Sequence, residues 1–78
     1  MKFLKDNVVY DTSKAKCNWK TGSSPLNPIL YLSSKDTYYL ISDKEFVKVF
    51  SEVEAAAWLL FNNIELPENL KKYNTIIE

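Results

Sequence analysis

Residues 29–50 constrain the fold most, because they hold three β-rich runs separated by short polar connections. The runs cover residues 29–32, 37–41 and 45–50, and the connections are Ser33-Ser34-Lys35-Asp36 and Asp43-Lys44. β-Branched and aromatic residues favour strands, whereas Ser and Asp favour tight turns. The order predicts an antiparallel meander. Its third strand should be half buried, with Phe46, Lys48 and Phe50 alternating against Val47 and Val49.

A helix from Glu52 to Asn62 is predicted directly after the meander. Ser51 and Glu54 form the Ser-x-x-Glu pattern of a capping box, which satisfies unpaired N–H groups at a helix start. The apolar residues fall into two neighbouring sectors, Val53, Ala56, Ala57, Leu60 and Phe61 in one and Ala55, Trp58 and Leu59 in the other. One small sheet cannot cover both sectors, so either the C-terminal tail or another molecule must cover the second.

Shorter elements are predicted on both sides of this unit. The sequence predicts a hairpin over residues 2–10, a single helical turn over 11–15, a short strand over 16–19 and a loop over 20–28. Pro67 can open a short helix through Tyr73, and residues 75–77 form a final strand or a fraying tail. The predicted fold is one α+β domain, residues 1–78. It has an antiparallel sheet of four to five short strands, one main helix on a face and a short C-terminal helix.

Composition limits the possible functions. The chain has 78 residues, of which 46% are hydrophobic, so it forms one small domain of marginal stability that a partner or a twin subunit would stabilise. Ten lysines, with no arginine, balance ten acidic residues. Zero net charge argues against a nucleic-acid binder, which needs a basic surplus, and against a DNA mimic, which needs an acidic one.

The chain contains no His, which excludes Ser-His, Cys-His and His-metal chemistry within it. The sequence therefore predicts that the protein is not an enzyme and binds neither a cofactor nor a metal ion. Cys17 is the single cysteine, so no internal disulfide forms and the chain suits a reducing compartment. We expect the Cys17 side chain to be a small buried hydrophobe. Charge interrupts the first residues and no apolar run is long enough for a bilayer, so we expect a cytoplasmic protein without a membrane partner.

Several motifs occur in a suggestive order: Tyr10-Asp11-Thr12 with Ala15, then Leu30-Tyr31 with Tyr38-Tyr39-Leu40, then Ser51-x-x-Glu54-Ala55-x-x-Trp58-Leu59. In this order the chain resembles small proteins encoded by phages and conjugative elements, some of which are anti-CRISPR or other anti-defence inhibitors. The resemblance implies binding and blockade of a host protein complex, and it transfers no active-site residue. Asp36 stands where such proteins often carry Gly, and Leu32 where they carry a basic residue. The middle is short and the net charge of the chain is zero, so acidic mimicry of nucleic acid does not carry over.

The aromatic residues are the candidate binding residues. Trp58 fits the core better than an interface, whereas Phe61 fits either. Tyr38 and Tyr39 are adjacent in a strand and point to opposite faces, so one of them should be exposed and available to a partner. Trp19 lies near Lys16 and Lys20 and could stack on a nucleic-acid base, although no wider basic groove accompanies it.

The sequence thus predicts a non-catalytic protein-binding module. Its most specific form is an anti-defence inhibitor that occludes a host protein or ribonucleoprotein complex, with homodimerisation favoured by the apolar helix. Direct binding of nucleic acid is disfavoured. The alternative function is a small nucleic-acid-associated regulator that uses a local face of Lys and aromatic residues.

Overall fold

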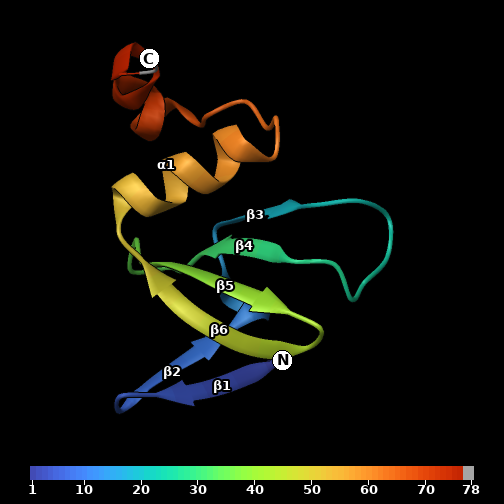
Figure 1. The fold of residues 1–78 in the computed structure, drawn as a ribbon. Coiled ribbons are helices and arrows are strands. Elements are labelled where there is room, and N and C mark those ends of the chain that lie inside the picture. The colour runs from blue at the N-terminus through green and yellow to red at the C-terminus, as the bar shows by residue number, and fades with distance from the viewer. Residues whose placement is uncertain (77–78) are drawn as a thin grey trace.

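A computed structural model describes residues 1–76, and their side chains as far as Tyr73. Within these residues there are six strands, one α-helix and two 3-10 helices (Figure 1). Their bounds are β1 Lys2–Lys5, β2 Val8–Asp11, η1 Thr12–Lys14, β3 Cys17–Lys20, β4 Ile29–Leu32, β5 Tyr38–Ser42, β6 Glu45–Phe50, α1 Glu52–Phe61 and η2 Glu68–Ile76. The predicted α+β class is confirmed. The strands divide into a sheet of two, β1-β2, and a sheet of four, β3-β4-β5-β6.

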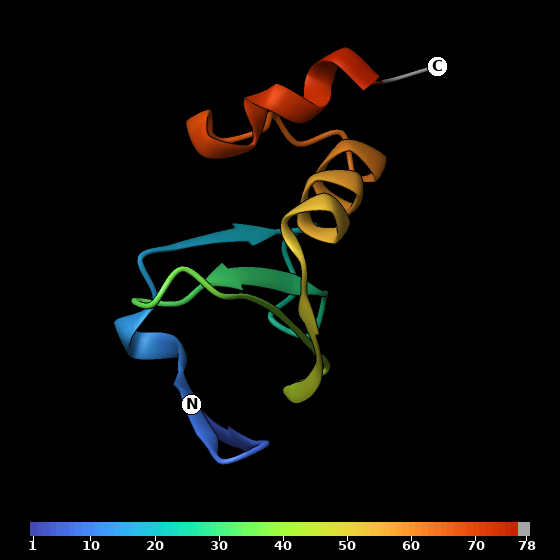
Figure 2. The same cartoon turned by 90° about the vertical axis from the view of Figure 1, so that its left-hand side faces the viewer.

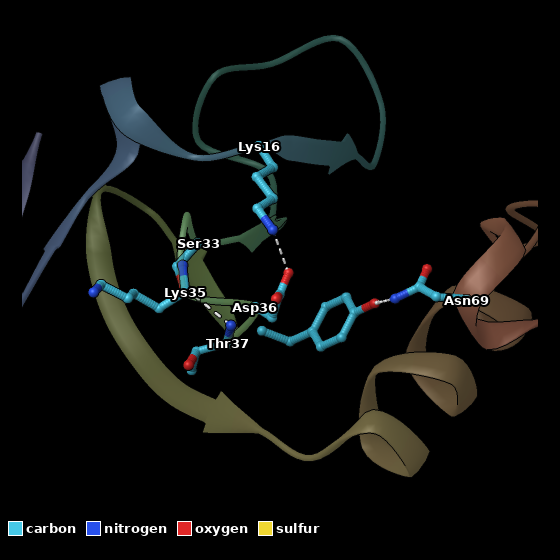
Figure 3. Close-up of polar contacts among 7 residues, drawn as sticks. Lys16, Ser33, Lys35, Asp36, Thr37 and Asn69 are labelled. Carbon is cyan, nitrogen blue, oxygen red and sulfur yellow. Dashed lines mark hydrogen bonds and ion pairs between the residues drawn. The ribbon is translucent and has the colours of Figure 1, made fainter.

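The four-stranded sheet is an antiparallel meander, and its turns use the polar residues that separate the runs. Asp43 and Lys44 have φ values of 53° and 64°, as the central residues of a type I′ hairpin turn require. The β4–β5 connection is closed by Ser33, whose Oγ accepts a hydrogen bond from the Thr37 backbone N at 3.0 Å (Figure 3). Lys16 also forms an ion pair with Asp36 of this connection. These contacts fix the register in which Tyr31 lies opposite Tyr39.

The N-terminal hairpin covers one face of this sheet. Asp6 and Asn7 adopt the left-handed backbone of its turn, with φ values of 51° and 66°. Phe3 and Tyr10 are cross-strand partners on the inner side of the hairpin. The Tyr10 ring lies 4.9 Å from the Tyr39 ring, measured between centroids. In Figure 2 the hairpin lies below the sheet, whereas α1 and η2 lie above it. Both faces of the meander are therefore covered.

Helix α1 and the segment after it cover the other face. The capping box is present: the Ser51 Oγ accepts from the Glu54 N, and a Glu54 carboxylate oxygen accepts from the Ser51 N. After the helix, Leu66 and Leu70 are buried in the same apolar cluster. The tail therefore covers part of α1. The expected short helix after Pro67 is a 3-10 helix that continues to Ile76, so the alternative of a strand over residues 75–77 is wrong at residues 75 and 76. Residue 77 lies outside the described residues.

Strand β6 departs from the simple alternation that its sequence predicts. The register with β5 shifts between Leu40 and Ile41, so Phe46 lies opposite Ile41 while Lys48 lies opposite Leu40. The additional residue changes the phase of the strand. Phe46 therefore packs with the hairpin cluster and Phe50 with the helix cluster, on opposite faces of the sheet.

Candidate protein-binding face on helix α1

Helix α1 presents a narrow face to the sheet. Its buried residues are Ala55, Ala56 and Leu59. At 100° per residue these three positions span about 100° of the helix circumference. Two of them are alanines, which allow the helix backbone to lie close to the sheet. Trp58 and Leu60 flank this face and are half-buried against the same cluster. The opposite side of the helix is left to solvent.

That outer side carries an apolar row. Val53 is 58% exposed, Phe61 is 87% exposed, and Ala57 between them is also exposed. The three residues are spaced by four, so they lie one above another along the helix. We call this row the α1 stripe. An 87% exposed Phe side chain leaves most of its apolar area in water, where burial would be favourable by about 25 cal/mol per Å².

The carboxylates at the start of α1 have lysine partners. The Lys48 Nζ lies 2.6 Å from the Glu54 Oε2, and the Lys72 Nζ lies 3.2 Å from the Glu52 Oε1. The hydrogen bond from Lys48, followed by that from the Ser51 backbone, lowers the pKa of Glu54. The hydrogen bond to Glu52 raises the pKa of Lys72. The stripe is therefore bordered at its N-terminal end by compensated charges.

The other two candidate aromatic residues on this side of the sheet belong to the core more than to the surface. Trp58 packs against the helix cluster, as the sequence favoured. Trp19 is half-buried in the edge strand β3, with its ring 6.2 Å from the Tyr38 ring between centroids. A ring held in this contact offers only part of its surface to a base or to a protein.

The expectation that Tyr38 or Tyr39 is exposed was wrong. Tyr38 is 2% exposed and Tyr39 is 0% exposed. They do point to opposite faces, but α1 covers one face and the hairpin the other. The Tyr38 hydroxyl accepts a hydrogen bond from the Asn69 Nδ2 at 2.7 Å, a contact that Figure 3 shows at the start of η2. Neither tyrosine can contact a partner while the domain is folded.

Cys17 also differs from its expected place. It is exposed on β3, the edge strand of the sheet, and is not the small buried hydrophobe that the sequence favoured. Sequence reasoning also missed an exposed apolar pair outside the α1 stripe. Leu4 and Val9 are cross-strand neighbours on the outer side of the hairpin, and both are exposed. Strand alternation gives the signal, because both are adjacent to the inward-facing Phe3 and Tyr10.

In the part of the chain with described side chains, no cluster of three Cys, Asp or Glu residues could hold a metal ion. No helix in the described region has the length and apolar character needed to cross a membrane. Searches against protein-family models, curated proteins and solved structures found no match to this chain.

Proposed function

We propose that this protein is a non-catalytic protein-binding module whose contact surface is the α1 stripe. In its most specific form it is an anti-defence inhibitor carried by a phage or another mobile element, which occludes a host protein or ribonucleoprotein complex. The single observation that carries the proposal is the 87% exposure of Phe61 on a helix that is otherwise held firmly by its core.

Phe61 has the features of an interface anchor. Large aromatic side chains dominate the energetics of protein interfaces when they enter a closed pocket on the partner. A rigid helix presents Phe61 at little entropic cost, because the backbone is already ordered before binding. Val53 and Ala57 extend the contact along the same line. This is the pattern of a helix that docks into an apolar groove.

The charge distribution supports a protein target over a nucleic acid. Four of the ten lysines, Lys16, Lys48, Lys71 and Lys72, lie in ion pairs with carboxylates. These ion pairs reduce the positive potential that phosphate groups would meet. The α1 stripe itself is uncharged. Association should therefore depend on apolar burial, and its affinity should change little with salt.

Capture from a host lysate with three variants of the tagged protein tests the proposal. We compare wild type, Phe61→Ala and Leu4→Ala, the last being a matched control because Leu4 is 74% exposed on the distant hairpin. One protein or ribonucleoprotein complex should be retained by wild type and Leu4→Ala at moderate salt. Phe61→Ala should weaken the complex by about 2 kcal/mol or more without unfolding the domain.

Two results would contradict the proposal. Equal capture by Phe61→Ala would remove the α1 stripe from the interface. Capture that disappears at moderate salt and after nuclease treatment would replace the protein-binding function with the nucleic-acid-associated regulator, because counterion release gives a steep salt dependence.

A further inference from the structure

We propose that a second copy of this chain covers the α1 stripe in the free protein, so that self-association masks the surface until a target displaces it. The inference rests on the proposed function, since it concerns the same face and adds its regulation. Two features of the stripe favour a second copy as its occupant, its symmetry and its border of charges, and its size sets the strength of the contact.

The stripe is symmetric about Ala57. Val53 precedes Ala57 by four residues and Phe61 follows it by four. A two-fold axis through Ala57 places two α1 helices antiparallel, with Phe61 of each copy against Val53 of the other. Such an isologous interface requires a self-complementary patch, and this row has one. A large residue therefore meets a smaller one at both ends of the contact.

The small side chain at the centre allows the two helices to approach closely. Rows of residues spaced by four form the ridges that interdigitate at a crossing angle of about −50°, with about 8–10 Å between helix axes. The exposed Ala57 lies where the helices cross and presents only a methyl group there. Phe61 and Val53 then fill the space on either side of the crossing point.

The helix dipoles favour the antiparallel arrangement. It places the first turn of one helix, where Glu52 and Glu54 are paired with lysines, near Asn62 and Asn63 at the C-terminal end of the other. A parallel arrangement would align the two helix dipoles unfavourably. Both acidic residues already have lysine partners, and the chain has a net charge of zero. Two copies therefore meet without long-range repulsion.

The size of the stripe sets the strength of the contact. Stable specific interfaces bury about 1,200–2,000 Å² in total, more than three side chains on each helix can provide. We therefore expect a dissociation constant of about 10 μM to 1 mM, equivalent to roughly −7 to −4 kcal/mol. A dimer of this strength covers Phe61 at high protein concentration. A target that binds the α1 stripe more tightly can displace the second copy.

Sedimentation over a wide concentration range tests the association. Wild type and Leu4→Ala should show a reversible monomer–dimer equilibrium. Phe61→Ala should weaken it at least tenfold, and Ala57→Gln should weaken it similarly by blocking the crossing point, while both variants keep the wild-type circular dichroism spectrum. A wild-type protein that stays monomeric to about 1 mM, the upper end of the expected range, overturns the inference. Equal dimerisation of folded Phe61→Ala also overturns it.

Cross-linking tests the geometry. At the expected crossing, about 8–10 Å between helix axes leaves about 3.4–5.4 Å between the two Cα atoms of residue 57, a range that overlaps the separation of about 4.4–6.8 Å that a disulfide spans. In a Cys17→Ser background, Ala57→Cys should therefore oxidise to a covalent dimer much faster than Val47→Cys, a control whose parent side chain is 49% exposed on β6. Equal oxidation rates in the two variants would contradict the proposed crossing point.

The covalent dimer also separates masking from the function itself. Oxidised Ala57→Cys should capture less target than its reduced form, and reduction should restore capture. Equal capture in both forms overturns masking, while the proposed function stands. If Phe61→Ala loses the dimer but still captures the target, the dimer stands and the α1 stripe is removed from the target interface.

Discussion

Replacing Tyr39 by Phe should stabilise the domain, although Tyr39 lies at the centre of the hairpin-facing cluster. Its ring stacks on Tyr31, with 5.3 Å between centroids, and on Phe46, with 5.9 Å. Its hydroxyl is buried, and none of the described residues offers it a hydrogen bond. An unsatisfied buried polar group costs about 1–3 kcal/mol. Phe keeps the ring contacts and removes that cost, so Tyr39→Phe should raise the free energy of unfolding by about 1 kcal/mol.

The same substitution should change the response to alkaline pH. Burial, followed by the nearby Tyr31 and Asp11, raises the pKa of Tyr39 to about 12 from its ordinary value of 10. The unfolded chain therefore releases this proton at lower pH than the folded chain does. The stabilisation is complete below pH 10 and is lost as pH rises through about 12, a change on the order of 3 kcal/mol. Tyr39→Phe should remove this part of the loss of stability at alkaline pH. A smaller loss should remain, because burial also raises the pKa of Tyr31 and of Tyr38.

Tyr38 provides the matched control, because it is also buried but its hydroxyl has a partner in Asn69. Tyr38→Phe should lower the free energy of unfolding by about 0.5–1.5 kcal/mol, the usual net value of one hydrogen bond. Urea unfolding followed by Trp fluorescence at pH 7 and at several values up to pH 12 measures both variants. Destabilisation by Tyr39→Phe comparable to that of Tyr38→Phe would mean that the Tyr39 hydroxyl is satisfied, and the reasoning would be refuted.

Three further substitutions test the local structure, each measured by thermal or urea unfolding. Ser51→Ala removes half of the capping box and should destabilise the domain by about 1 kcal/mol, whereas no change would mean that the box contributes nothing. Lys44→Gly relieves a positive φ in a hairpin turn and should stabilise by up to about 1 kcal/mol; destabilisation would contradict the turn type. Trp58→Ala should destabilise by about 2 kcal/mol, below the 3–5 kcal/mol of a fully buried ring, and a wild-type melting temperature would make Trp58 a surface residue.

Most elements could be predicted from the sequence because their signals are local. The turn at Asp43 and Lys44 and the capping box at Ser51 and Glu54 each depend on a few neighbouring residues. The resulting strand β6 and helix α1 follow the predicted bounds, with Asn62 as the helix C-cap. The bulge in β6 was missed, because it depends on pairing with β5 and leaves no local pattern in the strand itself.

Burial was harder to predict, since it depends on which elements meet. The prediction that either Tyr38 or Tyr39 is exposed assumed a sheet that is covered on one face only. The hairpin covers the second face through Phe3 and Tyr10, contacts that no short sequence pattern specifies. Cys17 shows the opposite error: adjacency to Trp19 suggested burial, but the pair lies on an edge strand that few elements cover.

The two covered faces also explain why the exposed row on α1 is informative. A domain of this size is only marginally stable, and here the sheet is enclosed by both the hairpin and the helix. The sequence showed that α1 has more apolar residues than one sheet can cover, but two candidate sectors remained. Leu66 and Leu70 cover one flank of the helix and leave Phe61 outside. Because the core is closed without Phe61, this ring makes little contribution to folding. Its apolar area is therefore available for binding, which is why substitution of Phe61 can separate binding from stability.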